Sequence, residues 1–257
     1  MKIRSIYLAI LLAGLFSCNS PKTNNSSENA SSEAVPEETK KDNVLSAVEK
    51  EEGWLLLFDG ESSEGWRGFN QKTLPSGWIV ESGTLKSLGQ GGDIGGDIVY
   101  GAQEFENFEL YLEWKISEGG NSGIFYHVLE GDQYEAPYQN APEYQLVDDL
   151  GFPGKLEEWQ KVGADYAMYY TDSANKIIRP AGEWNSSRIK FDGGKVEYWL
   201  NGKMTVSFEA WSDDWYKRKQ SGKWKNYADY AMAKKGLIGL QDHGSFIWFR
   251  NIKIKAL

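Results

Sequence analysis

The stretch "FELYLEWKIS", residues 108–117, alternates between large apolar and polar side chains. Successive side chains of a β-strand point to opposite faces, so a period of two indicates a strand with one buried face. The buried face would carry Phe108, Leu110, Leu112 and Trp114. Such a strand belongs to a sheet that packs on one side and meets solvent on the other.

A second stretch, "FDGGKVEYWLNGK" (residues 191–203), predicts how neighbouring strands connect. Its Gly193-Gly194 and Asn201-Gly202 pairs favour tight hairpin turns, so the stretch predicts an antiparallel meander. From residue 53 onward, only residues 155–162 and 210–235 favour helices. Roughly ten strands in one domain predict an all-β fold, either a sandwich or a barrel. Similar strand-like runs are "WLLLFDG" (54–60), "GWIVESGTLKS" (77–87), "SGIFYHVLE" (122–130), "EYQLVDD" (143–149), "GLIGLQDHG" (236–244) and "FIWFRNIKIK" (246–255).

The composition narrows the class of partner. The chain has 257 residues and a formal net charge of −9, with a pI near 4.9. No basic stripe is present to neutralise phosphates, which argues against a nucleic-acid partner. Aromatic residues make up 14% of the chain, with 11 Trp and 14 Tyr. They predict either a large β core or a set of stacking platforms for sugar rings.

The first 18 residues, "MKIRSIYLAILLAGLFSC", have a basic start and an apolar run that is too short to span a membrane comfortably. They resemble a bacterial lipoprotein signal, although Phe16 is bulkier than usual at its position. Cys18 is the only cysteine, so no disulfide within the chain can form. We predict that Cys18 is lipidated, with a cleaved signal or an uncleaved anchor as alternatives. No acidic run follows directly after Asn19, which favours an envelope protein that faces the periplasm.

Residues 19–52 are rich in Ser, Asn and Glu and contain almost no large apolar residues. Such a composition predicts a disordered tether, because little apolar surface is available to offset the entropy of ordering. A brief helix is expected near its end, in "NVLSAVEKEEG" (residues 43–53). The folded domain is predicted to span residues 53–257, and membrane contact is expected only through the lipid.

Polar residues interrupt two apolar strands. In "GGNSGIFYHV" (119–128), alternation places Asn121 and His127 on one face. In "PEYQLVDD" (142–149), Glu143 and Gln145 share a face, which is either open to solvent or part of a polar cleft. Asn121 could instead stabilise a turn, and His127 could be a buried residue that bonds to a neighbour.

The "PEYQLVDD" strand also invites comparison with the E-x-D-x-x-E strand of laminarinase-type glycosidases. The matching positions are Glu143, Gln145 and Asp148, so an amide replaces the middle acid and the last acid is shorter. Retaining hydrolysis needs two carboxyl groups about 5 to 5.5 Å apart. Ordinary retaining hydrolysis is therefore not expected from this strand.

The motif "GLQDHG" (239–244) holds one of the two histidines of the chain. Gln241 and His243 would share a face of a strand, while Asp242 would point away and not orient the histidine directly, unless the chain turns at the strand end and breaks the alternation. Histidine exchanges protons readily near neutral pH. A histidine that only bonds across a turn is the alternative.

Together these motifs resemble the 3-keto-disaccharide hydrolase domain, a family of Bacteroidetes and related bacteria that often occurs as lipoproteins. The resemblance covers residues 53–257 and implies a concanavalin-like jelly-roll sandwich of two antiparallel sheets, with its site on the concave face. It also implies cleavage of sugars whose C3 hydroxyl a partner dehydrogenase has oxidised. It is carried above all by "GGNSGIF" (119–125) and "LQDHG…WFRNI" (240–252).

The resemblance to enzymes that cleave 3-keto sugars implies a role for each polar residue singled out above. Glu143 and His243 are the predicted proton-transfer pair, and a wider set of polar residues is expected to bind substrate. Many relatives carry His where this chain has Tyr198. If that His helps catalysis in the relatives, this chain would be a weaker enzyme, an enzyme of different specificity or only a binder. The expected substrate-binding residues are Asn121, His127, Gln145, Asp148, Gln241 and Asp97.

The sequence predicts no cofactor. A divalent metal stays an alternative, since acidic residues and histidine converge, but two histidines without ligand spacing support it weakly. Two further classes of function remain open. One is a non-catalytic carbohydrate-binding sandwich with aromatic platforms, and the other is a structural lipoprotein that presents a surface.

Overall fold

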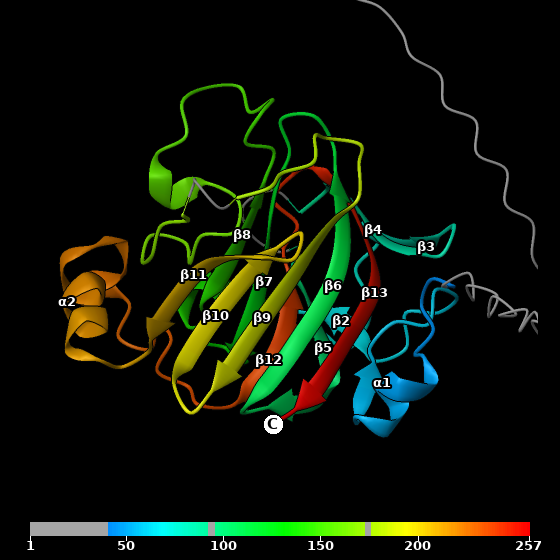
Figure 1. Ribbon diagram of the computed structural model, residues 1–257, viewed down its shortest axis with the longest axis horizontal. Helices are drawn as coiled ribbons and strands as arrows, with labels where there is room; N and C mark the ends of the chain where they lie inside the picture. The colour runs from blue at the N-terminus through cyan, green and yellow to red at the C-terminus, as the bar shows by residue number, and fades with distance from the viewer. Residues whose placement is uncertain (1–40, 92–95, 173–175) are drawn as a thin grey trace, which may run out of the picture. The chain divides into compact units, whose positions relative to one another are not determined.

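The computed structural model describes residues 41–91, 96–172 and 176–257, and within them two antiparallel sheets pack face to face (Figure 1). The all-β prediction is confirmed. From edge to edge, the eight-stranded sheet contains β11 (Lys203–Glu209), β10 (Lys195–Leu200), β9 (Asn185–Asp192), β6 (Phe108–Ile116), β13 (Phe246–Ala256), β4 (Thr84–Leu88) and β3 (Trp78–Glu81), and β1 (Trp54–Leu56) pairs with β13. The five-stranded sheet contains β2 (Trp66–Gly68), β5 (Ile98–Phe105), β12 (Gly236–Leu240), β7 (Asn121–Val128) and β8 (Glu143–Val147).

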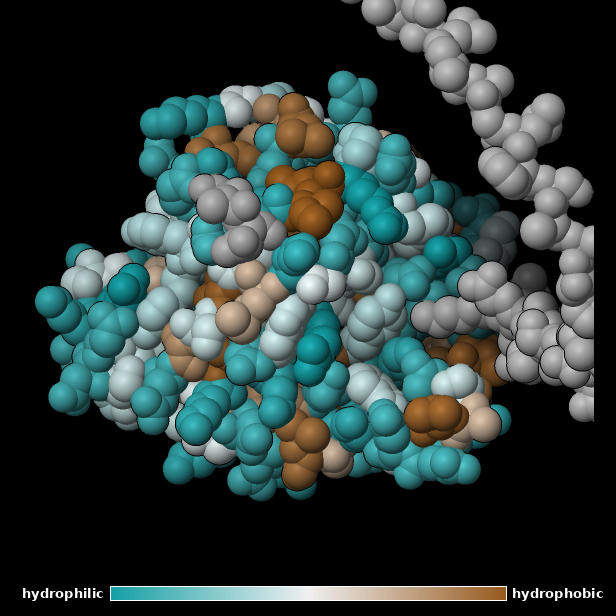
Figure 2. Space-filling view, viewed as in Figure 1, coloured by the Kyte–Doolittle hydropathy of each residue, from teal (hydrophilic) through white to brown (hydrophobic). Residues whose placement is uncertain are grey.

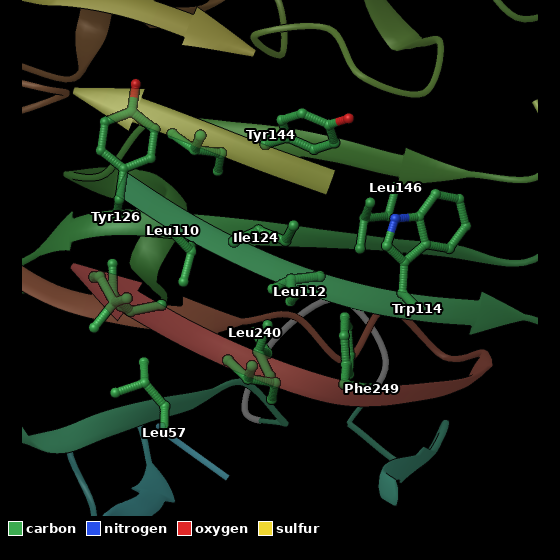
Figure 3. Close-up of a cluster of buried hydrophobic side chains, with 14 of the residues drawn as sticks. Leu57, Leu110, Leu112, Trp114, Ile124, Tyr126, Tyr144, Leu146, Leu240 and Phe249 are labelled. Atoms are coloured by element: carbon green, nitrogen blue, oxygen red, sulfur yellow. The ribbon is translucent and has the colours of Figure 1, made fainter. Parts of the chain in front are cut away.

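Strand β6 has the alternation that its sequence predicts. Its apolar side chains are buried between the sheets, and the residues between them are partly exposed. Figure 3 shows Leu110, Leu112 and Trp114 of β6 in one cluster with Ile124 and Tyr126 of β7. The opposite face of the larger sheet is covered mainly by hydrophilic residues (Figure 2).

The predicted meander is formed by β9, β10 and β11, which pair consecutively and antiparallel. Its turns fall at the two expected dipeptides. Asn201 and Gly202 have φ values of 48° and 77°, and Gly193 and Gly194 have 58° and 93°. Glycine and asparagine tolerate this left-handed region best, which explains why these residues make the turns.

Residues 41–52, which the sequence assigned to the tether, have a defined structure. Asn43 and Asn251 bond reciprocally: each backbone amide donates to the other side-chain oxygen, at 2.5 and 2.8 Å. The expected short helix is confirmed as α1 (Ala47–Glu51), capped by Ser46. The hydrogen bonds between Asn43 and Asn251 thus attach this segment to the sheet, although its helix buries no side chain. Cys18 lies outside the described residues.

The 3₁₀ turns η1 (Pro137–Gln139) and η3 (Lys223–Asn226) border the face of the smaller sheet that points away from the core, and helix α2 (Asp213–Ser221) packs against η3. The helix expected over 155–162 is only a 3₁₀ turn, η2 (Glu158–Gln160), because the chain that follows pairs with β8 through the backbone of Gln145. Strand β8 is consequently buried on both faces.

Candidate active site

A pocket of about 540 Å³ lies on the face of the smaller sheet that points away from the core. Tyr144 and Leu146 of β8 point into the core, so Glu143 and Gln145, which alternate with them, point into this pocket. Five of the residues expected from the sequence meet here, from β7, from β8 and from the turn after β12. The lining residues are Asn121, Tyr138, Glu143, Gln145, Tyr166, Lys223, Gln241 and His243.

Glu143 is the acidic centre of the pocket. Its side chain lies over Gly123 of the neighbouring strand, and the residue is only 4% exposed. Burial raises the pKa of the Glu143 carboxyl to about 8, with smaller contributions from Asp97 and Asp165, while the Lys223 ammonium opposes the rise. The carboxyl is therefore mostly protonated at neutral pH and can donate a proton.

A row of amides lies beside this carboxyl. Gln145 Nε2 donates to the Gln160 carbonyl at 3.1 Å and to Asn121 Oδ1 at 3.2 Å. On the other side of Gly123, Gln241 is 7% exposed and its Oε1 is buried without a hydrogen-bond partner among the described residues. An unpaired buried acceptor is costly, so this oxygen suits a ligand that donates a hydrogen bond.

His243 lines the pocket, and the acid next to it has a separate task. The Asp242 carboxylate accepts hydrogen bonds from the backbone amides of Gly91 and Gly244, at 2.8 and 3.0 Å. The Asp242 carboxylate thus holds the surrounding turns together. His243 is thereby presented on a fixed loop at the end of β12.

Three lining residues, Tyr138, Tyr166 and Lys223, were not predicted from the sequence. The Lys223 ammonium lies over the rings of Tyr166 and Trp224, 4.3 and 4.9 Å from their centroids. Desolvation lowers the pKa of Lys223, and Glu143 opposes this shift. No local motif marks these residues, because the docking of segments far apart in sequence places them. The cluster of Trp224, stacked on Tyr230 at 4.1 Å, fixes the segment that carries Lys223.

His127 does not reach the pocket, which corrects the prediction from strand alternation. Its φ of 55° turns the chain, and the strand pairing shifts register opposite it. Its ring therefore joins Tyr126 on the core side and lies 4.6 Å from Phe191, with Nε2 bonded to the Glu106 carbonyl at 2.8 Å. Burial lowers the pKa of His127 to about 4, so the ring is neutral at physiological pH.

Two predicted substrate-binding acids also lie outside this pocket. Asp148 accepts from the backbone amides of Gly119 and Leu150 and so stabilises the turn after β8. Asp97 accepts from the amide of Asp242 at 2.9 Å, and burial raises its pKa to about 7. Both carboxyl groups are needed by the backbone around the pocket, so their contribution to the site is to its shape and charge.

Tyr198 is fully buried between the sheets. Its hydroxyl pairs with that of Tyr126 at 2.9 Å and donates to Asp165 at 3.4 Å. The Tyr198 ring does not line the pocket, and it bonds to Asp165, whose charge helps to raise the pKa of Glu143.

The described residues contain no group of three or more His, Cys, Asp and Glu side chains arranged to hold a metal ion. The same part of the chain contains no helix long and apolar enough to cross a membrane. The pocket itself presents a carboxyl, an imidazole, an ammonium and several amides.

The chain was compared with known proteins. The family model described as the 3-keto-alpha-glucoside-1,2-lyase-like domain matches residues 53–255. A curated 3-keto-disaccharide hydrolase of Bacteroides thetaiotaomicron is 36% identical over 234 residues, which cover 80% of this chain and 79% of the relative.

Solved structures from Parabacteroides distasonis are also similar. One, described as a candidate glycosyl hydrolase, has a TM-score of 0.78 at 46% identity and covers 84% of this chain and all of its own. A second candidate glycosyl hydrolase from this organism has a TM-score of 0.61 at 31% identity and covers 79% of this chain and 99% of its own.

Proposed function

The chain belongs to the family of 3-keto-alpha-glucoside-1,2-lyase-like domains, and from that premise we propose that it cleaves glycosidic bonds of 3-keto sugars by elimination and hydration. The observation that carries the proposal is the pairing of Glu143 and His243 in one pocket. Glu143 is the only carboxyl group among the described residues that line it. Retaining and inverting glycosidases use two carboxyl groups, so a different route to bond cleavage is required.

A ketone at C3 provides that route. It acidifies the proton on C2, and the glycosidic oxygen on C1 lies β to the carbonyl. Removal of the C2 proton forms an enolate, whose electrons expel the aglycone oxygen from C1 and leave a C1–C2 double bond. Water then adds to C1 while C2 regains a proton. The net reaction consumes one water and releases the aglycone and a 3-keto sugar.

The two proton-transfer groups take distinct roles. Glu143, protonated at neutral pH because burial raises its pKa, donates its proton to the departing aglycone oxygen. His243 accepts the proton from C2. The half-buried rings of Tyr138 and Tyr166 line the same pocket and provide apolar faces for the sugar or the aglycone. The names of the curated relative and of the family model, a hydrolase and a lyase, support this sequence of steps.

The proposal also implies a place in a reaction sequence and in the cell. A dehydrogenase must first oxidise the C3 hydroxyl of the glycoside, because only the ketone activates C2. We further propose that Cys18 carries a lipid that anchors the enzyme in the cell envelope, facing the periplasm, with the segment after it as a tether.

The direct test compares a 3-keto-glucoside with its unoxidised parent. Purified protein lacking the first 40 residues is incubated with each, and release of the aglycone is measured. We expect the parent to react slower by orders of magnitude. Equal rates on the two sugars would refute elimination, and binding of both sugars without release would indicate a carbohydrate-binding module instead.

A further inference from the structure

We infer that the Asn121 carboxamide is the donor that holds the C3 oxygen of the substrate, and that Gln145 is the positioning residue that aims it. This inference rests on the proposed function and adds to it the group that receives the developing negative charge. It is carried by the direction of the hydrogen bonds in the row Gln160, Gln145 and Asn121.

The direction of this row is determined at one end. The Gln160 group that contacts Gln145 is a backbone carbonyl, which can only accept, so Gln145 must present its NH₂ group to it, at 3.1 Å. The other hydrogen of the same NH₂ then points to Asn121 at 3.2 Å, so Asn121 must present its oxygen. The Asn121 NH₂ is consequently left for the pocket. The identity of each amide end follows from the bonds themselves.

The same argument leaves Gln145 Oε1 as an acceptor in the pocket that this residue lines, because its NH₂ group is used by Gln160 and Asn121. Gln241 Oε1 is buried without a hydrogen-bond partner among the described residues and provides a second acceptor. Together with the donor at Asn121, the floor offers one donor and two acceptors around Gly123. A 3-keto sugar has the complementary set, since its ketone can only accept and the hydroxyls on C2 and C4 can donate.

A donor at this place favours the transition state more than the bound substrate. The ketone oxygen becomes negatively charged as the C2 proton leaves, and a hydrogen bond to an ionised acceptor is roughly twice as strong as a neutral one. Loss of one preorganised donor of this kind typically lowers kcat by about 10²- to 10³-fold. Gln145 already orients Asn121, so no reorganisation is needed.

The experiment isolates proton removal from bond cleavage. The probe is the 3-keto form of 1,5-anhydroglucitol, which has no leaving group on C1, and exchange of its C2 proton in D₂O is followed by NMR. We expect Asn121→Asp to slow exchange about 10²- to 10³-fold while the KM for a cleavable 3-keto-glucoside changes by less than about tenfold. Asn121→Ala provides a second variant, and thermal melts show that each is folded. Asn226→Asp, which adds the same charge on the exposed part of η3, is the matched control and should exchange normally.

The positioning role of Gln145 is tested separately, by comparing exchange rates in single and double variants. If Gln145 acts through Asn121, Gln145→Met slows exchange in the parent protein, and adding it to Asn121→Asp causes little further loss. Independent, multiplicative losses would overturn the positioning role, and exchange at the parent rate in Asn121→Asp would overturn the donor role. A parent protein that neither exchanges C2 nor cleaves 3-keto-glucosides would refute the proposed function itself, and the inference with it.

Discussion

Glu143 occupies the space that a side chain at Gly123 would take: a Cβ on this glycine would lie 2.8 Å from Glu143 Cγ. The two residues sit on adjacent strands, and Gly123 pairs in register with Gln145. The absence of a side chain therefore allows the carboxyl group to lie flat on the sheet. The position of the Glu143 carboxyl therefore depends on Gly123, which takes no part in the chemistry.

Gly123→Ala should displace the Glu143 carboxyl and reduce turnover. A Cβ contact below 3.0 Å forces a shift, and here the neighbour is a side chain on a buried floor. We expect kcat for a 3-keto-glucoside to fall at least tenfold, since small misplacements of a reacting group are costly. Gly239→Ala is the matched control on the neighbouring strand, because its Cβ would meet Ile98 and Phe125 but no pocket residue. It should lower the melting temperature without lowering the rate of the folded enzyme, and a similar rate loss in both variants would contradict the explanation.

The free energy of unfolding should depend on pH through Glu143. Its pKa rises from an ordinary 4.5 to about 8 on folding, so ionisation is penalised in the folded state. Its contribution to stability is complete below about pH 4.5 and is lost as the pH rises through about 8. Glu143→Gln removes this loss, so relative to the parent the variant should gain stability between pH 5 and 9, by at most a few kcal/mol. Melting temperatures measured across this range test the prediction, and a constant difference would refute it.

The sequence predicted the parts of the fold that depend on local pattern. The alternation of β6 and the two turns of the meander involve neighbouring residues only. The pocket residues Asn121, Glu143 and Gln241 were also found, because polar side chains on otherwise apolar strands need partners or ligands. Lys223 was missed because its place depends on the docking of residues 210–235 onto distant loops.

His127 shows the limit of the alternation rule. A single left-handed residue turns its side chain to the other face of the sheet, and nothing in "GIFYHV" indicates that conformation. Asp148 and Asp97 were expected to bind substrate from the family resemblance. Both accept hydrogen bonds from backbone amides outside the pocket, whose positions only the folded chain defines.

The two histidines should respond differently to removal. His243→Ala should fold normally and lose turnover by about 10²- to 10⁴-fold, the usual contribution of a general acid or base. His127→Ala should instead lower the melting temperature, because it leaves a cavity among Phe108, Tyr126 and Phe191. Its folded fraction should turn over at the parent rate. The proposed role of His243 fails if its variant melts early yet keeps normal turnover.

Cys18→Ser should release the protein from the membrane fraction. A lipid on Cys18 is the only anchor that we propose, and the described residues contain no helix that could span a membrane. Membrane and soluble fractions of cells that produce the parent and the variant are compared by immunoblot. A variant that stays with the membranes would contradict lipid anchoring.

Lys223→Met should change the pH dependence of turnover as well as its rate. Glu143 acts as an acid in the proposed mechanism, so kcat/KM should decline as the pH rises past about 8. The Lys223 ammonium stabilises the ionised form of Glu143 and thereby lowers its pKa. Removing that charge should move the alkaline decline to higher pH, while kcat/KM at neutral pH falls about tenfold because the enolate loses a nearby cation. Lys223→Arg should keep the parent profile, and Lys225→Met, which removes a charge from the exposed side of the same 3₁₀ turn, should change neither quantity. An unmoved alkaline decline in Lys223→Met would show that this lysine does not act on Glu143.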